Sequence, residues 1–350
     1  MSLFDNLLKD TESLFLDPIA LDYDYQPKLV PYRESHQHFI ASCIKPLFQN
    51  RNGKNLFIFG TPGVGKTVSM KHVLNEIYQK TSDIIPIYIN CWKTDTPHKI
   101  ALEICKKINY KFTHNKDTSE LLKEIAKILN KKSTVMVLDE IDKLQDKSIL
   151  YFITEELFRK SIFLITNNKD FLIHLDKRIN SRLILQNLEF KPYTLDQTFG
   201  ILKQRTEYAF VPNSIKKEVL ELISKKTFEL KDIRTGLFLL KEAAELAESE
   251  SSKLIEKKHA HQAIEKLSHI KIKNSAELED ERRYILNLIK QNPNKTSKEL
   301  YELYKNKTNK SYRTFLRKLK FLKNQNWIEI KETDINYKKK FIINIRKDIL

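Results

Sequence analysis

Short apolar runs alternate with longer amphipathic stretches through the first half of the chain. The runs have the length and apolar character of buried strands: residues 55–59, 83–90, 134–138, 161–166 and 186–190. The stretches between them have the spacing of amphipathic helices. Strands that alternate with helices favour a parallel sheet covered by helices, so the sequence predicts an α/β domain over residues 1–193.

The apolar pattern changes after residue 193. Residues 194–268 show no strand-like alternation, and apolar positions there recur at helical spacing: Ile215, Val219, Leu220, Leu222, Ile223, Leu237, Leu239, Leu240, Ala243 and Ala244. This pattern predicts a small helical lid domain over residues 194–275. The polar residues 273–276 are the expected linker to a third domain at residues 276–350.

The third domain has the pattern of three helices followed by two strands. After a first helix at residues 284–289, Thr296 and Glu299 form a capping box that opens a second helix, and a third helix starts near Ser311. Two runs of strand character follow, at residues 327–330 and 341–345. This order predicts a winged-helix domain that binds DNA.

The third helix of this domain divides into a basic face and an apolar face. Arg313, Arg317 and Lys320 share the face that is expected to enter a major groove. The opposite, packing face is expected to hold Phe315, Leu316, Leu319 and Leu322. The wing carries three lysines that can neutralise phosphates without bidentate base recognition: Lys338, Lys339 and Lys340. The alternative is a solvated basic helix face.

Charge supports a polyanionic partner. The formal net charge is +17, and residues 271–350 hold 21 Lys and Arg against 10 Asp and Glu. Double-stranded DNA is the commonest such partner, although a lysine-rich surface with no partner gives the same balance. The start of the chain lacks the pattern of a signal peptide, and no apolar run approaches membrane-spanning length. Three widely spaced cysteines indicate no disulfide framework or zinc site, so we expect a cytoplasmic, nucleoid-associated protein without a membrane partner.

A phosphate-binding motif follows the first predicted strand. Residues 60–67 match G-x-x-x-x-G-K-[ST] completely, the Walker A pattern, and the next residues are helical in pattern. Backbone N–H groups of such a loop converge on the phosphates of ATP or ADP, while Lys66 can reach the outer phosphates and the Thr67 hydroxyl can ligate Mg²⁺. The expected nucleotide contacts are Pro62, Gly63, Val64, Gly65, Lys66, Thr67 and Val68.

Two adjacent carboxylates end the third predicted strand. Asp139 is expected to hold the magnesium shell opposite Thr67, and Glu140 is placed to accept a proton from the attacking water. Asn167 follows the next strand and could orient that water, although Asn pairs are also ordinary turn formers. The pattern predicts a nucleotide-hydrolysing site at one edge of the sheet.

These features resemble the AAA+ ATPases and, within them, the archaeal replication initiators of the origin-recognition and cell-division-control type. The resemblance covers nearly the whole chain and rests on short segments in the order of that family: residues 17–21, 30–34, 88–91, 165–168, 175–178, 181–183, 190–193 and 232–234. It implies an AAA+ parallel-sheet domain, a helical lid and a C-terminal winged helix. It also implies a DNA-gripping helical insertion within residues 94–130, where we assign no residues.

The resemblance implies roles for several residues. Asn167 is similar to the first sensor, Arg234 to a second sensor in the lid, and Arg182 to the finger offered to a neighbouring subunit's ATP, with Arg178 as the alternative finger. Tyr193 and Arg205 match nucleotide-contacting positions. The chain departs from the family pattern at four positions near the lid turn and subunit contact: Trp92, Asn168, Lys177 and Lys231.

The function implied is that of an ATP-dependent replication initiator. Such a protein binds double-stranded origin DNA, uses weak ATP hydrolysis as a switch, and helps recruit or load the replicative helicase, with further copies or paralogues beside it on DNA. Two alternatives stay open. One is a related DNA-binding regulator of replication or transcription that uses ATP as a structural switch, and the other is a transposition-type AAA+ ATPase.

Overall fold

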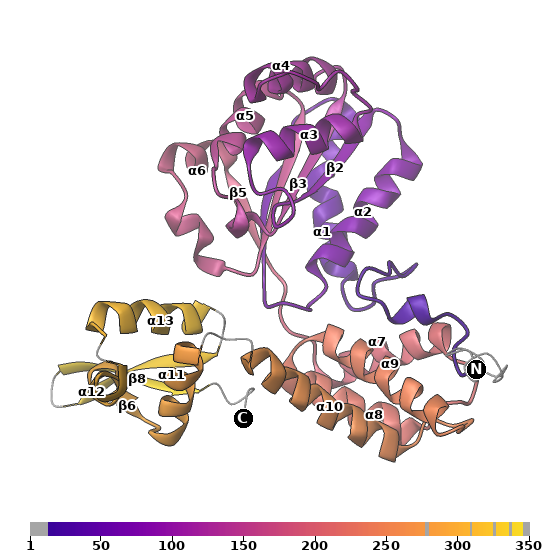
Figure 1. Ribbon diagram of the computed structural model, residues 1–350. Coiled ribbons are helices and arrows are strands. Elements are labelled where there is room, and N and C mark those ends of the chain that lie inside the picture. The colour runs from indigo at the N-terminus through magenta and orange to yellow at the C-terminus, as the bar shows by residue number, and fades with distance from the viewer. Residues whose placement is uncertain (1–12, 277–279, 309, 325–326, 336–337, 346–350) are drawn as a thin grey trace. The chain divides into compact units, whose positions relative to one another are not determined.

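The computed structural model describes residues 13–276, 280–308, 310–324, 327–335 and 338–345 (Figure 1). The chain forms two compact units, Met1–Ala260 and His261–Leu350. Within the described ranges, no helix combines the length and the apolar character that a bilayer crossing requires.

A five-stranded parallel sheet forms the centre of the first unit. Its strands are β1 (Asn55–Phe59), β2 (Ile84–Asn90), β3 (Ser133–Asp139), β4 (Lys160–Thr166) and β5 (Leu185–Glu189). The strand order is β2-β3-β4-β1-β5, and every pair is parallel. The five strands confirm the prediction to within one residue at each end.

Helices cover both faces of this sheet, which is why the inner strands β3 and β4 are almost wholly buried, whereas β5 at the sheet edge carries exposed polar residues. One face packs on α1 (Glu34–Ile44) and α2 (Lys66–Lys80), with Leu56 and Ile58 of β1 in the core between them. The other face receives Phe57 and Phe59 of β1. The helices on that side are α3 (Pro97–Lys107), α4 (Thr118–Leu129), α5 (Ser148–Glu156) and α6 (Lys177–Leu183). Short 3₁₀ turns complete this region: η1 (Pro18–Leu21), η2 (Lys45–Gln49), η3 (Ile141–Lys143) and η4 (Lys169–His174).

The carboxyl ends of the strands bring the predicted chemistry to one edge. Phe59 of β1 pairs with Thr166 of β4, and Asn90 of β2 pairs with Asp139 of β3. Because all strands are parallel, the loops after β1, β3 and β4 leave the sheet side by side. The phosphate loop, the two carboxylates and Asn167 therefore share this edge.

The helices of the predicted lid follow β5: α7 (Leu195–Ala209), α8 (Lys217–Leu230), α9 (Ile233–Ser249) and α10 (Lys257–Ala276). A reciprocal capping box between Thr194 and Gln197 opens α7. Two details differ from the prediction. Ile215 precedes α8 and pairs with Ile255 in an isolated β-bridge. Residues 273–276, expected as a linker, continue α10 because nothing in their sequence breaks the helix.

The N-terminal segment, which we define as residues 13–33, packs on these lid helices before the chain enters α1. The backbone N–H of Leu16 donates to the carbonyl oxygen of Ala209 at 2.8 Å, and that of Leu14 donates to Glu248 at 2.7 Å. Figure 1 shows this segment running beside α7 and α9. The N-terminal segment therefore belongs spatially to both parts of the first unit.

The second unit has the order expected of a winged helix: α11 (Asp280–Gln291), β6 (Lys295–Thr296), α12 (Ser297–Thr308), α13 (Tyr312–Asn324), β7 (Ile328–Ile335) and β8 (Lys338–Ile345). The strands form an antiparallel sheet in the order β6-β8-β7. The predicted capping box is present, since Thr296 and Glu299 exchange hydrogen bonds at 2.7 and 3.4 Å. A separate apolar core holds the unit together, with Tyr304 and Phe315 at its centre.

Candidate functional site

The phosphate loop joins β1 to α2 and owes its shape to two glycines. Gly63 and Gly65 have φ values of 74° and 88°, which disfavour residues with a side chain. A Cβ at Gly63 would lie 1.9 Å from Oδ1 of Asp232, and one at Gly65 would lie 2.5 Å from the hydroxyl of Tyr193. The loop thus packs closely against Asp232 of the lid at Gly63 and against Tyr193, which precedes the lid, at Gly65.

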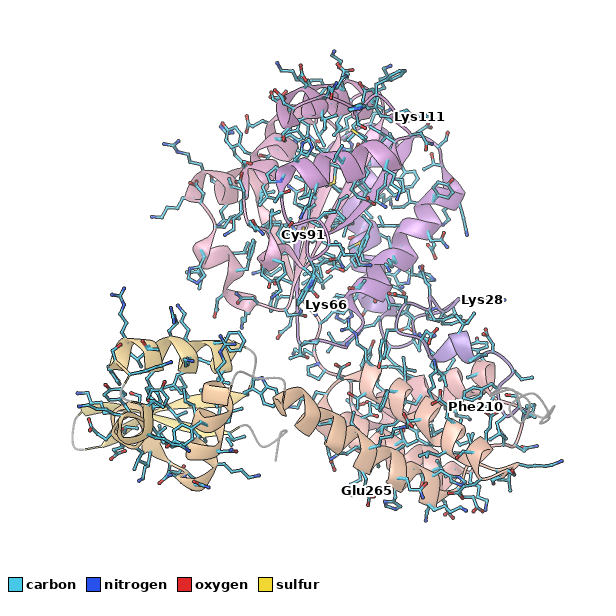
Figure 2. The ribbon with its side chains drawn as sticks, in the orientation of Figure 1. Lys28, Lys66, Cys91, Lys111, Phe210 and Glu265 are labelled. Atoms are coloured by element: carbon cyan, nitrogen blue, oxygen red, sulfur yellow. The ribbon has the colours of Figure 1, made fainter. Side chains whose placement is uncertain are left out.

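Lys66 is the first residue of α2 and lies on the side of the sheet domain that faces the lid helices (Figure 2). Its Nζ donates to the carbonyl oxygens of Gly60 and Thr61 at 2.8 and 2.9 Å, and to Oδ1 of Asn167 at 2.7 Å. Burial lowers the pKa of Lys66 to about 8, against the opposing effect of the neighbouring carboxylates. The ammonium therefore stays mostly charged near neutral pH and suits a phosphate ligand.

Asp139 is buried at the end of β3 and accepts three hydrogen bonds. Thr67 Oγ1 and the Tyr88 hydroxyl each donate to its Oδ2 at 2.7 Å, and the backbone N–H of Glu140 donates to its Oδ1 at 2.9 Å. These donors hold the carboxylate in one orientation. The Thr67 hydroxyl and the Asp139 carboxylate together supply two oxygen ligands of the kind that Mg²⁺ prefers. Mg²⁺ is usually bound through one or two carboxylates together with waters and phosphate oxygens, so Thr67 and Asp139 are a sufficient protein contribution to such a site.

Glu140 and Asn167 face each other across the strand ends. The Nδ2 of Asn167 donates to both carboxylate oxygens of Glu140, at 3.1 and 3.2 Å, while its Oδ1 accepts from Lys66. Burial, with the negative charges of Asp139 and Asp142, raises the pKa of Glu140. Glu140 also has the left-handed backbone conformation, with φ 54°, which is costly for a residue with a side chain and is typical of functional positions.

Two lid residues approach the phosphate loop. Asp232 caps the start of α9 by accepting from the backbone N–H of Arg234 at 2.9 Å, and it is the residue that a Cβ on Gly63 would strike. The positive charge of Arg234 lies near enough to lower the pKa of Lys66. The charge of Arg234 is therefore within electrostatic range of the predicted nucleotide site.

Tyr193 and Arg205 are both buried but have different surroundings. Tyr193 lies against Gly65 of the phosphate loop, and burial raises its pKa. The guanidinium of Arg205 donates to the carbonyl oxygen of Ala20 at 3.2 Å and lies 4.8 Å from the ring centroid of Tyr25. Arg205 thus contacts the N-terminal segment, whereas Tyr193 contacts the phosphate loop directly.

The two finger candidates lie on the exposed surface of α6. Arg182 forms an ion pair with Glu155 of α5, and its guanidinium lies 5.0 Å from the ring centroid of Tyr151. The side chain of Arg178 is also exposed, near the start of the same helix. Neither has a described contact with the phosphate loop, and the finger role of either stays a prediction. Pro62 is exposed on the loop, Val64 is buried under it, and Val68 is half-buried in α2.

Two contributors to the site have no motif of their own in the sequence, although both fall within segments that carry the family resemblance. Tyr88 was part of the family resemblance without a role, and the structure shows it donating to Asp139. Its strand position offered a hint, because Tyr88 is two residues from Asn90, which pairs with Asp139, and alternate strand residues share a face. Arg33 is the second contributor, and a lone arginine before a helix gives no signal of burial.

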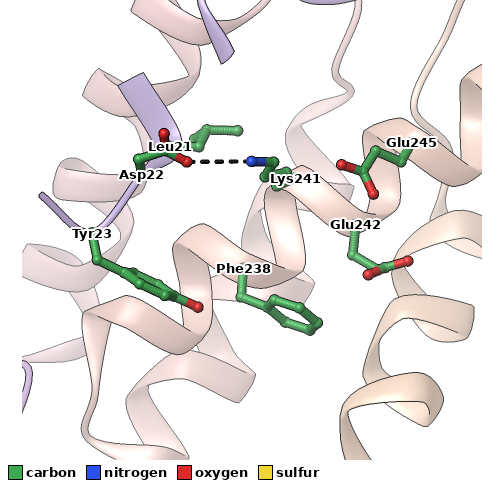
Figure 3. Close-up of a pocket in the computed structure, with 7 residues that line it drawn as sticks. All are labelled: Leu21, Asp22, Tyr23, Phe238, Lys241, Glu242 and Glu245. Carbon is green, nitrogen blue, oxygen red and sulfur yellow. Dashed lines mark hydrogen bonds and ion pairs between the residues drawn. The ribbon is translucent and has the colours of Figure 1, made fainter. Parts of the chain in front are cut away.

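A pocket of about 240 Å³ lies apart from the phosphate loop, between the N-terminal segment and α9 (Figure 3). Asp22 and Lys241 form an ion pair at 3.2 Å on its wall, and Glu242 and Glu245 add two more carboxylates. The surplus of negative charge makes this pocket unsuitable for a polyphosphate.

The residues of the predicted basic face of α13 are exposed. On the predicted apolar face, one residue differs from the prediction. Arg313, Arg317 and Lys320 are exposed, and Phe315, Leu319 and Leu322 are buried. Leu316 was expected to pack, but it is 40% exposed, and Lys318 is 8% exposed in its place. The helical period explains this correction, because positions 313, 316, 317 and 320 form one stripe and positions 315, 318, 319 and 322 the opposite one. Lys338, Lys339 and Lys340 lie in β8, but their side chains are outside the described residues.

Together, the parallel sheet, phosphate loop, paired carboxylates and adjoining lid define an AAA+ ATPase with a C-terminal winged-helix unit. Family models agree: an AAA domain matches residues 49–172, and a Cdc6 AAA+ ATPase-type lid domain matches residues 199–265. The chain belongs to the family of ORC1-type DNA replication proteins. It is 32% identical to ORC1-type DNA replication protein 2 of Methanothermobacter thermautotrophicus, over 91% of this chain and 89% of that protein.

Further relatives agree with this assignment. ORC1-type DNA replication protein 1 of Archaeoglobus fulgidus is 31% identical over 87% of this chain and 79% of its own length. Among solved structures, the Orc1 protein of Aeropyrum pernix in complex with DNA matches with a TM-score of 0.76 and 26% identity, over 95% of this chain and 94% of that one. Cdc6p of Pyrobaculum aerophilum, at 20% identity, shares the fold with a TM-score of 0.67 over 95% and 94% of the two chains.

Proposed function

We propose that this protein is an ATP-dependent initiator of DNA replication that binds double-stranded origin DNA and helps recruit or load the replicative helicase. The observation that supports this most strongly is the match to ORC1-type replication proteins over nine-tenths of the chain. The exposed basic face of α13 supplies charges suited to phosphates and base edges. Such a protein would act at the nucleoid of the cytoplasm.

The strand-end residues have the chemistry for slow hydrolysis of ATP. The phosphate loop N–H groups and Lys66 would bind the phosphates, and Glu140, whose raised pKa makes it a better base than a free carboxylate, would accept the proton of the attacking water. Asn167 would hold Glu140 and Lys66 in register. Mg²⁺, held by Thr67 and Asp139, would supply positive charge to the phosphate oxygens when bound.

Hydrolysis in this proposal is a switch between two states of the lid. Asp232 and Arg234 already contact or approach the phosphate loop, so a change in the terminal phosphate would alter the forces between lid and loop. Arg182 would serve a neighbouring copy or paralogue on DNA, after exchanging its ion pair with Glu155 for a phosphate. Turnover is accordingly expected to be weak in a single chain, because that arginine is missing from its own site.

Crosslinked immunoprecipitation from the protein's own cells, with sequencing of the bound DNA, tests the proposed function. One or a few sharp peaks at replication start sites, with loss of helicase loading there after depletion of the protein, are the expected result. Peaks spread over promoters would instead identify a DNA-binding regulator. An absence of localised peaks, together with ATP hydrolysis strongly stimulated by DNA, would indicate a transposition-type ATPase.

A further inference from the structure

Arg33 is a buried arginine that joins the phosphate loop to the connection between sheet and lid. It lies directly before α1 and is 5% exposed. Its Nε donates to the carbonyl oxygen of Val64 at 3.0 Å, and its terminal nitrogen donates to that of Lys191 at 2.6 Å. Val64 belongs to the phosphate loop, and Lys191 lies between β5 and α7. One guanidinium therefore binds both segments at once.

Aromatic rings hold this guanidinium in place. Its central carbon lies 4.0 Å from the ring centroid of Tyr193 and 5.2 Å from that of Phe190. A planar, rigid fork between two rings can donate in fixed directions, which a lysine ammonium cannot. The two rings and the two hydrogen bonds thus hold the Arg33 guanidinium in one position.

The bond to Val64 has a consequence for the phosphate side of the loop. In a trans peptide, the C=O of one residue and the N–H of the next point in opposite directions, and the described residues contain no cis peptide. Turning the Val64 carbonyl toward Arg33 turns the N–H of Gly65 away from it. Gly65 N–H is one of the loop donors that converge on phosphates in this motif.

Tyr32, the preceding residue, contacts the lid. It has a left-handed φ of 63° and a side chain that is 41% exposed. Its hydroxyl lies so close to α7 that a Cβ on Gly200 would come within 2.1 Å of it and within 3.0 Å of its Cζ. A glycine inside a helix usually weakens it, so this close contact explains why α7 has one.

We propose that Arg33 is a positioning residue for nucleotide binding and that Tyr32 couples it to the lid. Arg33 sets the direction of a phosphate-loop peptide, while its neighbour rests on α7, so movement of the lid changes the geometry of the loop. This inference rests on the nucleotide site proposed above. No part of it requires Arg33 or Tyr32 to touch the nucleotide.

The first test replaces Arg33 with Lys in the full-length protein. Arg33→Lys keeps the charge but loses the fork, so the dissociation constants of ATP and ADP should rise at least about tenfold, the usual effect of losing a charge-assisted hydrogen bond. Arg51→Lys, at an exposed arginine, is the matched control and should bind as the wild type does. Thermal unfolding without nucleotide shows whether Arg33→Lys is folded at the assay temperature.

The outcomes separate this inference from the proposed function. A wild-type protein that fails to bind ATP and ADP would refute the nucleotide site itself. Wild-type binding, with Arg33→Lys affinities within about twofold of it and only a lower Tm, would make Arg33 an ordinary packing residue and overturn the inference. A tenfold loss in a folded Arg33→Lys protein would support it.

The second test is a double-mutant cycle between Gly200→Ala and Tyr32→Asn, since Asn tolerates a left-handed conformation. Beside Tyr32, the new methyl group displaces the ring, and nucleotide affinity should fall several-fold. In the Tyr32→Asn protein, the same Gly200→Ala change should leave affinity unaltered and raise Tm, because alanine favours the helix. Equal effects of Gly200→Ala on affinity in both backgrounds would overturn the coupling through Tyr32.

Discussion

Asp139 shows how single side chains set the geometry of the candidate site. Its Oδ2 accepts from both Thr67 of α2 and Tyr88 of β2. Burial and this hydrogen bond to Asp139 raise the pKa of Tyr88, so the phenol stays protonated and remains a donor. Tyr88 therefore orients the Asp139 carboxylate while staying neutral, so it adds no second negative charge that would attract a cation away from Asp139.

Replacing the two central residues of the site should separate binding from hydrolysis. Lys66→Ala removes a buried cation, so ATP affinity should fall at least about 30-fold, the cost of losing one partner of a buried charge pair. Glu140→Gln should bind ATP normally and cleave it too slowly to detect. Equilibrium binding and single-turnover hydrolysis measure the two effects, with Lys80→Ala at the exposed end of α2 as the control. Wild-type turnover in Glu140→Gln would remove this carboxylate from the mechanism.

Glu140 should also make stability depend on pH. Its pKa is raised in the folded protein, so the fold disfavours the ionised form, and stability falls as pH rises from the unfolded pKa through the folded one. Glu140→Gln removes this cost. The Tm of the variant should therefore exceed that of the nucleotide-free wild type at pH 8, and the difference should shrink as pH falls toward 4.5, the ordinary pKa of Glu. A difference that is constant over this range would contradict the assignment.

The two faces of helix α13 differ, because one packs in the core and the other is exposed and basic. Its buried stripe holds Phe315 and Leu319 in the core of the second unit, and its exposed stripe carries Arg313, Leu316 and Arg317. An exposed leucine among arginines suits a duplex groove, where apolar side chains contact thymine methyl groups. The exposure of Leu316 thus extends the candidate DNA-facing surface.

Removing two charges from this stripe should change the salt dependence of DNA binding. Arg313→Ala with Arg317→Ala should weaken duplex affinity and lower the slope of log K against log salt by up to about 2, since each lost phosphate contact contributes about 0.9. Fluorescence anisotropy across a salt series measures the slope. Lys290→Ala with Lys305→Ala removes the same charge from exposed positions of α11 and α12. An equal change in this control would show that overall charge, and not the α13 stripe, governs binding.

Element bounds were largely predictable from the sequence, whereas side-chain networks were not. The strands follow from apolar runs that are buried on both faces, and the phosphate loop follows from a motif of fixed spacing. Arg33 and Tyr88 act through contacts with residues distant in sequence, which no local pattern encodes. Leu316 is exposed despite its apolar side chain, because the helical period places it on the same stripe as Arg313 and Arg317. Lys231, which stands where the family usually has glycine, adopts the left-handed conformation of a helix end at φ 55°.

At the scale of the whole molecule, the described residues form two units with separate apolar cores. The first contains the sheet and most of the lid helices, and the second contains the basic α13. Nucleotide chemistry and the candidate DNA surface are therefore built into different cooperative structures. We therefore expect each unit to gain or lose stability without the other.

Calorimetry should show this separation directly. The full-length protein should unfold in two transitions, and ATP should raise the midpoint of only one, because ligand binding stabilises only the unit that holds the ligand. A fragment of residues 261–350, the second unit, should reproduce the transition that ATP leaves unchanged. A single transition that shifts as a whole with ATP would show that the two units unfold together.

The hydrogen bonds of Asn167 fix the direction in which its carboxamide points. A carboxamide accepts at one end and donates at the other, and here the accepting end meets a cation while the donating end meets an anion. Rotating the group by half a turn would bring like charges together at both ends, so only one orientation is stable. Asp at this position would repel Glu140, and Lys would repel Lys66. The position therefore works as a directional connector, because the planar carboxamide joins its accepting and donating ends rigidly and a displacement of one end displaces the other.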